Sequence, residues 1–213
     1  MKIFSVKFER SLKNINQSFI HSFPEYAFVG RSNVGKSSLI NCITKKKIAK
    51  VSSYPGRTQC INYFLINHKW YLIDLPGYGF FSVKKEKQKT QKLITDYIFY
   101  QKNIVFLFLL IDCRLFIQKI DLNFIQKLNN TKIRFCIVFT KIDKLRNHRF
   151  IKDENICYYI KEIKKKSVSF LPIWFKVSVK NEDGINDIIQ HIKKLNDFYH
   201  PYTYKRKLII PNS

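Results

Sequence analysis

Apolar runs of strand length alternate with amphipathic stretches of helix length along most of the chain. Continuous apolar runs bounded by turn residues predict buried strands, whereas apolar residues at helical spacing predict helices. The strand-like runs lie at residues 25–30, 61–67, 69–77, 103–112, 133–143 and 172–179. The helical stretches begin after residue 35 and recur near residues 86–101, 115–129, 147–166 and 184–197. Strands separated by helices of this length predict parallel βαβ units and a three-layer α/β fold.

The runs 61–67 and 69–77 are joined only by a tight turn, so they predict one antiparallel hairpin in an otherwise parallel sheet. Residues 104–111 and 133–139 are apolar throughout, which predicts central strands covered on both faces. We therefore expect a mostly parallel six-stranded sheet with one antiparallel hairpin strand. The ends, 1–22 and 198–213, are basic with little apolar periodicity, and we expect them to be surface arms of a domain at 23–197.

Length and composition restrict the class of protein. A chain of 213 residues with 46% hydrophobic residues suits a single globular domain. No apolar run approaches the roughly 18 to 20 residues of a membrane span, and the N-terminus lacks the apolar region of a secretory signal. The five cysteines are widely spaced and none forms a pair with metal-ligand spacing, which favours reduced thiols in a cytoplasmic protein.

The charge of the chain is strongly positive, with 39 Lys and Arg against 15 Asp and Glu and a formal net charge of +24. Such a balance favours a polyanionic partner such as RNA or an acidic membrane face. The excess is mostly lysine, and the chain is rich in Ile, Asn, Phe and Tyr, which an AT-biased genome would also produce. No RNP, KH or zinc-knuckle signature accompanies the charge. RNA contact and genome bias therefore both stay open.

The stretch GRSNVGKS joins a predicted strand to a predicted helix, which is the context that a phosphate-loop motif needs. Its glycines allow backbone amides to surround phosphate oxygens at the positive end of the following helix. Lys36 would reach the β- and γ-phosphates, and the hydroxyl of Ser37 would bind Mg²⁺. An ordinary glycine-containing turn explains this combination less well. The predicted phosphate-binding residues are Gly30, Arg31, Ser32, Asn33, Val34, Gly35, Lys36 and Ser37.

A second motif, Asp74-Leu75-Pro76-Gly77, follows its own predicted strand. Because carboxyl ends of parallel strands gather at one edge of the sheet, Asp74 can face the same Mg²⁺ through a water. Gly77 would offer its backbone amide to the γ-phosphate, and we expect Lys36, Thr58 and Gly77 to take part in catalysis. Alone, such a stretch is common in turns. After a phosphate loop it predicts a nucleoside triphosphate site.

The nucleotide base is predicted by Thr140-Lys141-Ile142-Asp143 at the end of another strand. The carboxylate of Asp143 can accept hydrogen bonds from N1–H and the amino group of guanine, a pair that adenine lacks, and lost hydrogen bonds discriminate strongly. The aliphatic stem of Lys141 would cover one face of the base. Alone, the motif would suggest a solvated helix cap. A backbone amide in the run Val177, Ser178 and Val179 would meet the guanine O6.

The stretch PGRTQC precedes the hairpin, where a threonine could complete Mg²⁺ coordination when the γ-phosphate is present. Thr58 is the candidate, with Ser37 as the other protein ligand of the metal. The alternative is a plain Pro-Gly turn. The nucleotide-binding residues predicted in this loop are Gly56, Arg57, Thr58, Gln59 and Cys60.

Taken together, GRSNVGKSSLIN, PGRTQCINYF, DLPGYGF and FTKIDKL, with Asp112, Arg114 and Asp121, resemble the EngB family of small bacterial GTPases. The resemblance spans about residues 3 to 197. It implies a three-layer Ras-like P-loop G domain that uses GTP and Mg²⁺, acts in assembly of the large ribosomal subunit with that subunit or its precursors as partner, and is linked to normal cell division and septation. It also implies a monomer without a membrane partner. Val179 and the pair Phe80-Phe81 depart from the usual pattern of the family.

Many Ras-like GTPases place a Gln after the glycine of the second motif, where it orients the attacking water. Tyr78 stands at that position here, which predicts slow intrinsic hydrolysis. In related GTPases an Asn at the place of Asn33 helps to bind K⁺, so K⁺ is a candidate cofactor; an Asn that only tolerates the turn is the alternative. A GTPase with another client and a non-enzymatic basic RNA-binding protein remain alternative functions.

Overall fold

The computed structural model describes residues 1–17, 21–49, 60–79, 84–131, 133–145, 154–166 and 171–199. Its strands are β1 (Val6–Leu12), β2 (Glu25–Gly30), β3 (Ile61–Ile66), β4 (Trp70–Asp74), β5 (Ile104–Asp112), β6 (Phe135–Thr140) and β7 (Trp174–Lys176). Its α-helices are α1 (Lys36–Thr44), α2 (Lys84–Tyr100), α3 (Lys119–Asn129), α4 (Glu154–Lys166) and α5 (Ile185–Asp197). Two short 3₁₀ helices, η1 (Ile15–Gln17) and η2 (Ile142–Lys144), complete the elements of the described residues.

The described strands form one seven-stranded sheet in the order β1-β3-β4-β2-β5-β6-β7. The pairs from β4 through β2, β5 and β6 to β7 are parallel, whereas β3 pairs antiparallel with both β4 and β1. The mostly parallel α/β sheet with an antiparallel hairpin is thus confirmed. In the hairpin turn, Asn67 and His68 have φ of 50° and 56°, as a tight turn matched to the strand twist requires.

The expected number of six strands is wrong, because β1 lies in the segment predicted to be a basic surface arm. This strand is at the edge of the sheet, and among its residues only Leu12 is fully buried. Its pairing with β3 shifts register between Phe8 and Arg10. The side chain of Asn67 also holds the residues before the strand: its Oδ1 accepts from the amides of Phe4 and Ser5, at 2.9 and 3.1 Å.

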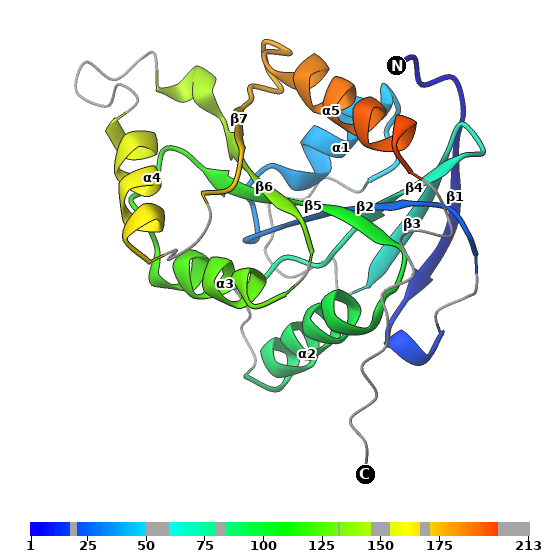
Figure 1. The fold of residues 1–213 in the computed structure, drawn as a ribbon, viewed down its shortest axis with the longest axis horizontal. Coiled ribbons are helices and arrows are strands. Elements are labelled where there is room, and N and C mark those ends of the chain that lie inside the picture. The colour runs from blue at the N-terminus through cyan, green and yellow to red at the C-terminus, as the bar shows by residue number, and fades with distance from the viewer. Residues whose placement is uncertain are drawn as a thin grey trace.

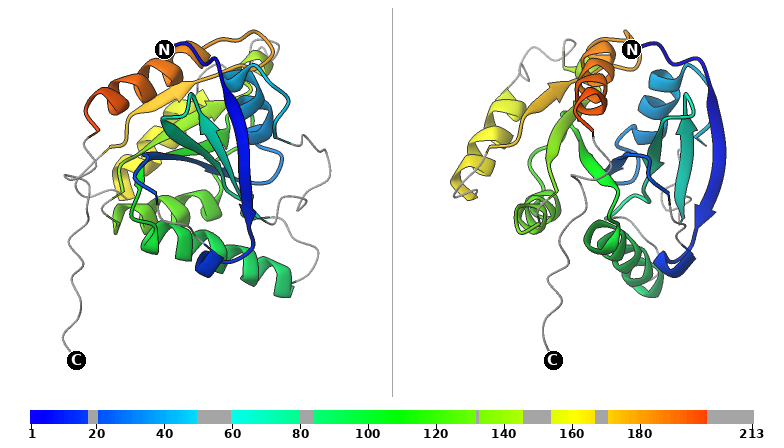
Figure 2. Two further views of the ribbon diagram at one scale, coloured as in Figure 1. Left: turned by 90° about the vertical axis from the view of Figure 1, so that its right-hand side faces the viewer. Right: turned by 45° about the vertical axis from the view of Figure 1, so that its right-hand side comes forward.

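Helices cover both faces of the sheet, which confirms the three-layer arrangement (Figure 1). Side chains of α1 and α5 pack on one face, and side chains of α2, α3 and α4 pack on the other. From Phe106 to Ile111, successive residues of β5 alternate between these two cores, and all nine residues of the strand are buried. The two further views show the same division, with the antiparallel strands β1 and β3 toward one side (Figure 2). A central strand buried on both faces needs no polar alternation, which is why its sequence is continuously apolar.

The parallel strands β2, β4, β5 and β6 all end at one edge of the sheet. Gly30, Asp74, Asp112 and Thr140 are their last residues, so the loops that follow these strands meet there. In an open α/β sheet this edge is where ligands bind. Within the described residues, no helix has both the length and the apolarity needed to cross a bilayer.

Candidate nucleotide-binding site

The predicted phosphate loop lies between β2 and α1. Asn33 and Gly35 have φ of 64° and 97°, so the backbone turns sharply before the helix begins at Lys36. No side chain caps the N-terminus of α1, although such amides are normally satisfied by a cap or a ligand. A Cβ atom on Gly30 would lie 2.8 Å from the carbonyl oxygen of Leu110, so only glycine allows this close packing on β5. The start of α1 therefore lacks a side-chain cap, as helix N-termini that bind anions do.

Lys36 and Asp74 form a buried ion pair between the amino group Nζ and the carboxylate Oδ1. Their side chains are only 8% and 2% exposed, so the pair lies in the interior of the site. The structure thus brings the phosphate-loop lysine and the acid at the end of β4 into direct contact. A buried ammonium requires an anionic partner, and the phosphates of a nucleotide would compete with Asp74 for it.

The segment after β4 runs beside the phosphate loop. The amide of Tyr78 donates to the carbonyl oxygen of Gly30 at 3.1 Å, and Tyr78 forms an isolated bridge with Arg31. A Cβ atom on Gly77 would lie 3.0 Å from both the backbone nitrogen and the hydroxyl oxygen of Ser32. Glycine therefore favours this close approach, because a side chain here would press on Ser32. Its backbone is held next to the loop in which the predicted phosphates would lie.

The predicted base loop is tied to the phosphate loop by two side chains. Thr140 donates from Oγ1 to the carbonyl oxygen of Val34 at 2.7 Å, and Lys141 donates from Nζ to the carbonyl oxygen of Asn33 at 2.7 Å. Lys141 has φ of 62°, a left-handed conformation at the point where β6 ends. The residues joined by these two bonds are 106 and 108 positions apart in the sequence, so the fold brings the two motifs together.

Asp143 is held by a residue from the last predicted loop. The hydroxyl of Ser178 donates to its Oδ1 at 2.8 Å, and Ser178 itself is fully buried. The amide of Ile142 donates to the carbonyl oxygen of Val177 at 3.3 Å, so the two loops lie side by side. The sequence interpretation gave this last loop only a backbone role. The hydroxyl that orients Asp143 was missed, because serine in a loop is too common to be a signal.

Gly184 is another residue that the sequence interpretation missed. It begins α5 with φ of 70°, and a Cβ atom there would lie 2.0 Å from the carbonyl oxygen of Lys176. Only glycine fits this turn, which closes the loop that carries Ser178. A glycine immediately before a helical pattern was the available signal.

Asp112 lies at the end of β5 beside the predicted base loop, although no role was predicted for it. Its carboxylate accepts from Arg114 Nε and Nη2 at 2.9 and 2.7 Å, and Lys141 Nζ lies 2.9 Å away. Burial raises the pKa of Asp112, but the hydrogen bonds from Arg114 and Lys141 outweigh this effect and hold the pKa below its ordinary value. The ionised carboxylate thus fixes the lysine that faces the base side.

Tyr78, at the position of the water-orienting Gln, is buried and faces helix α3. Its hydroxyl donates to Asp121 Oδ1 at 3.0 Å, and its ring stacks on Phe124 with a centroid distance of 4.5 Å. Burial and the nearby Asp121 carboxylate raise the pKa of Tyr78 well above its usual range. Held in this way, the hydroxyl is not available to orient a water at the phosphates.

Several predicted residues lie outside the described part of the chain: Gly56, Arg57, Thr58, Gln59, Phe80 and Phe81. Cys60 is described and is half-buried just before β3. Within the described ranges, no three His, Cys, Asp or Glu side chains come together in a group that could hold a metal ion. The hydroxyl of Ser37, in the first turn of α1, is an oxygen donor of the kind that Mg²⁺ prefers.

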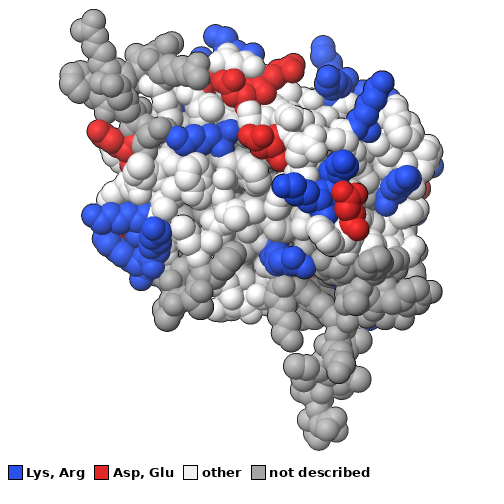
Figure 3. All heavy atoms as spheres, turned by 45° about the horizontal axis from the view of Figure 1, so that its top comes forward, with Lys and Arg blue, Asp and Glu red and all other residues white. Residues whose placement is uncertain are grey.

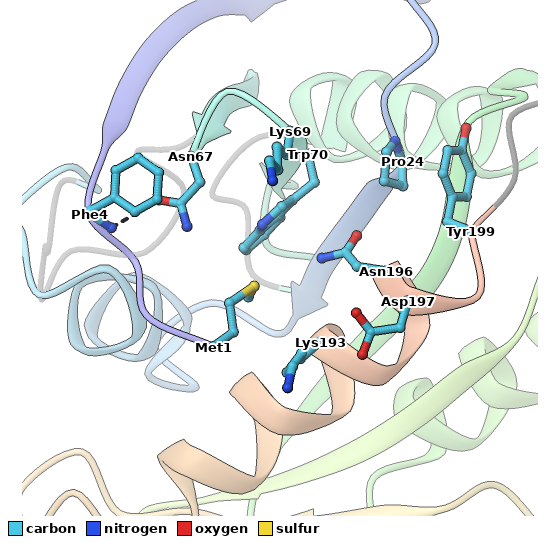
Figure 4. Close-up of a pocket in the computed structure, with 10 residues that line it drawn as sticks. All are labelled: Met1, Phe4, Pro24, Asn67, Lys69, Trp70, Lys193, Asn196, Asp197 and Tyr199. Atoms are coloured by element: carbon cyan, nitrogen blue, oxygen red, sulfur yellow. Dashed lines mark hydrogen bonds between the residues drawn. The ribbon is translucent and has the colours of Figure 1, made fainter.

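A separate cavity of about 330 Å³ lies near the opposite ends of the parallel strands (Figure 4). Residues from the N-terminal segment, the β3–β4 hairpin and α5 surround it, as the labelled side chains show. Its lining residues are Met1, Phe4, Pro24, Asn67, Lys69, Trp70, Lys193, Asn196, Asp197 and Tyr199. None of these belongs to the predicted nucleotide site.

A phosphate loop, a Lys–Asp pair and a base loop on one edge of this sheet define the class of P-loop G domains. A family model described as 50S ribosome-binding GTPase matches residues 25–141. A probable GTP-binding protein EngB from Phocaeicola vulgatus is 46% identical over 198 residues, covering 92% of this chain and 98% of the relative. A second, from Christiangramia forsetii, is 45% identical over 199 residues and covers 92% and 99%. The chain belongs to the EngB family of GTP-binding proteins.

Solved structures agree with the fold. A crystal structure of a probable GTP-binding protein engB has a TM-score of 0.65 at 26% identity, covering 82% of this chain and all of that chain. Era in complex with MgGDPNP and nucleotides 1506–1542 of 16S ribosomal RNA has a TM-score of 0.62 at 21% identity, with 81% and 56% coverage. The predicted Ras-like G-domain fold is confirmed by these likenesses.

Proposed function

We propose that this chain binds GTP at the carboxyl edge of its sheet, hydrolyses it slowly, and acts as a switch in assembly of the large ribosomal subunit. The observation that carries the proposal is the convergence of Asp74, Thr140 and Lys141 on one phosphate loop. The description of its family as 50S ribosome-binding GTPases supports the ribosomal partner. We expect the same switch to serve cell division and septation, and to act in the cytoplasm.

On the phosphate side, the uncapped amides of α1 and the ammonium of Lys36 would hold the β- and γ-phosphates. Ser37 and Thr58 would supply hydroxyl ligands to Mg²⁺, and Asp74 would accept a hydrogen bond from a metal-bound water. The metal ion would neutralise charge on the β- and γ-phosphate oxygens. Gly77 would donate its amide to the γ-phosphate, because its backbone lies against Ser32.

On the base side, Asp143 would accept hydrogen bonds from N1–H and the amino group of guanine. Its orientation by the Ser178 hydroxyl leaves the other carboxylate oxygen able to accept. The stem of Lys141, fixed by Asp112 and the carbonyl of Asn33, would cover the base. The amides near Ser178 and Val179 would meet O6.

Substitution Asp143→Asn tests this assignment, because an amide can donate to the additional carbonyl of xanthine but cannot accept the guanine donor pair. We expect GDP affinity to fall by about 100-fold or more and xanthosine diphosphate to become the better ligand. Titration of the fluorescent mant derivatives measures both affinities, and Asp96→Asn on α2 is the control for the same chemical change. Unchanged preference for guanine would refute the role of Asp143. A wild-type chain that binds no mant-GDP would instead favour the non-enzymatic RNA-binding alternative.

A further inference from the structure

Two buried carboxylates flank the connection from β5 to α3, and neither is among the residues proposed to contact the nucleotide directly. Asp112 ends β5 and Asp121 lies in the first turn of α3; they are 3% and 0% exposed. A carboxylate is rarely buried to this extent without a paired cation or strong donors. Each of the two has such partners, and the partners come from different loops of the nucleotide site.

Asp121 contacts the phosphate side of the site. Arg31 Nε lies 3.1 Å from its Oδ2, forming an ion pair, and the Tyr78 hydroxyl donates to its Oδ1 at 3.0 Å. Arg31 directly follows β2 in the phosphate loop, and Tyr78 directly follows Gly77. One carboxylate on α3 therefore holds the beginning of the phosphate loop and the residue beside the predicted γ-phosphate donor.

The backbone contacts make this arrangement sensitive to small displacements. Tyr78 donates from its amide to the carbonyl oxygen of Gly30, and a Cβ atom on Gly77 would make a tight contact of 3.0 Å with Ser32. A shift of the Tyr78 side chain would move the Gly77 amide relative to the loop. Because hydrogen bonds weaken steeply with distance and angle, such a shift would affect contacts to a γ-phosphate first.

Asp112 contacts the base side instead. Its partners are Arg114 and Lys141, and Lys141 in turn reaches the carbonyl oxygen of Asn33. Within the described residues, Asp112 forms no hydrogen bond or ion pair with Gly77 or Tyr78. The two carboxylates thus support separate halves of the site, one for the γ-phosphate and one for the base.

We propose that Asp121 is a positioning residue for the γ-phosphate, acting through Tyr78 and Arg31 on the amide of Gly77, and that Asp112 positions Lys141 for the guanine base. The proposal rests on the proposed GTP site and assigns each carboxylate to a different part of the nucleotide. Loss of the Asp121 contact reduces the preference for GTP over GDP, whereas loss of Asp112 weakens both nucleotides equally.

Tyr78→Phe is the most informative variant, because it removes one hydroxyl and keeps the buried ring that stacks on Phe124. We expect the affinity for mant-GMPPNP to fall about fivefold, with mant-GDP affinity changed less than about twofold. We also expect kcat for GTP to fall by a similar factor. A merely structural role would lower the melting temperature without changing the ratio of the two affinities.

Tyr97→Phe is the matched control. Tyr97 is equally buried and also donates to a carboxylate, that of Glu25, but at the first residue of β2, away from the nucleotide edge. It should leave the GMPPNP-to-GDP ratio at the wild-type value. Asp112→Asn should weaken both nucleotides by the same factor, and Asp121→Asn should change the ratio in the same direction as Tyr78→Phe.

Equal losses for both nucleotides in Tyr78→Phe, or no loss for either, would overturn the proposal. Wild-type binding of mant-GDP is measured in the same series, so failure of the GTP site itself is recognised separately. If Asp121→Asn does not fold, Tyr78→Phe alone decides, because it alters neither charge nor ring packing.

Discussion

Single residues in this site make contacts that their sequence motifs do not predict. Thr140 belongs to the motif predicted to bind the base, yet its hydroxyl donates to the phosphate loop, at the carbonyl oxygen of Val34. Asn33 has a left-handed φ of 64°, a conformation that Asn tolerates better than most residues. Its carbonyl oxygen accepts from Lys141. The backbone role of Asn33 is therefore visible, and a role for its side chain remains a proposal.

Potassium dependence tests the side-chain role of Asn33. Tyr78 stands in place of the water-orienting Gln, and its hydroxyl is bonded to Asp121. A cation bound near the phosphates would instead help catalysis, by stabilising negative charge in the transition state. We propose that GTP turnover is several-fold faster in KCl than in NaCl, and that Asn33→Gly, which keeps the left-handed turn accessible, abolishes this difference. Equal wild-type rates in both salts would remove potassium from the mechanism.

At the scale of elements, the sequence predicted the helices and central strands but missed β1. The central strands can be recognised from the sequence, because burial on both faces selects continuous apolar runs. The strand β1 pairs only with β3, four of its seven residues are polar or charged, and of its three apolar residues only Leu12 is fully buried. An edge strand needs partners for its backbone rather than an apolar pattern, so its existence depends on β3 and on the Asn67 side chain. Local periodicity could not reveal either.

The candidate site, like the sheet, could be predicted only in part from the sequence. Lys36, Asp74 and Asp143 follow strands in recognisable motifs, so their common edge could be predicted. Ser178 and Asp121 act through contacts with residues 35 and 43 positions away. Such long-range partners have no local signature. The loop around Thr58 lies outside the described residues, and its assignment stays a prediction.

The attachment of the N-terminal segment gives a prediction for β1. Asn67 accepts from two amides and donates from Nδ2 to the carbonyl oxygen of Lys2 at 2.8 Å. We expect Asn67→Gly, which keeps the left-handed turn, to cost about 1–3 kcal/mol of unfolding free energy and to speed hydrogen exchange at Phe4 and Ser5. Exchange measured by mass spectrometry checks this, with the hairpin amides as internal control. Unchanged protection at these two amides would show that the side chain does not hold the segment.

At the scale of the whole molecule, the charge of +24 still has two explanations. On the face drawn in Figure 3, Lys and Arg side chains occur in several groups with Asp and Glu between them. The described residues of that face do not form one continuous basic surface. The positions of the charges on this face do not decide whether the lysine excess serves RNA binding or reflects genome composition. Binding experiments can decide it.

Salt dependence is the corresponding prediction. If lysines neutralise RNA phosphates, co-sedimentation with large-subunit precursors falls at least about tenfold between about 50 and 200 mM KCl, because bound counterions are released. A nucleotide switch also requires different binding with GMPPNP and GDP. Small ribosomal subunits serve as the control particle. Binding independent of salt would assign the lysine excess to genome composition, and equal binding with both nucleotides would contradict the switch.

The two edge strands of the sheet affect how readily the protein would aggregate. A long, flat outer strand offers unpaired amides and carbonyls to any neighbouring chain and so promotes aggregation. Here one outer strand, β1, is kinked by its register shift and carries Lys7, Glu9 and Arg10, while the other, β7, is three residues long. Neither border offers a good template for adding a foreign strand. The fold thereby limits sheet-to-sheet polymerisation.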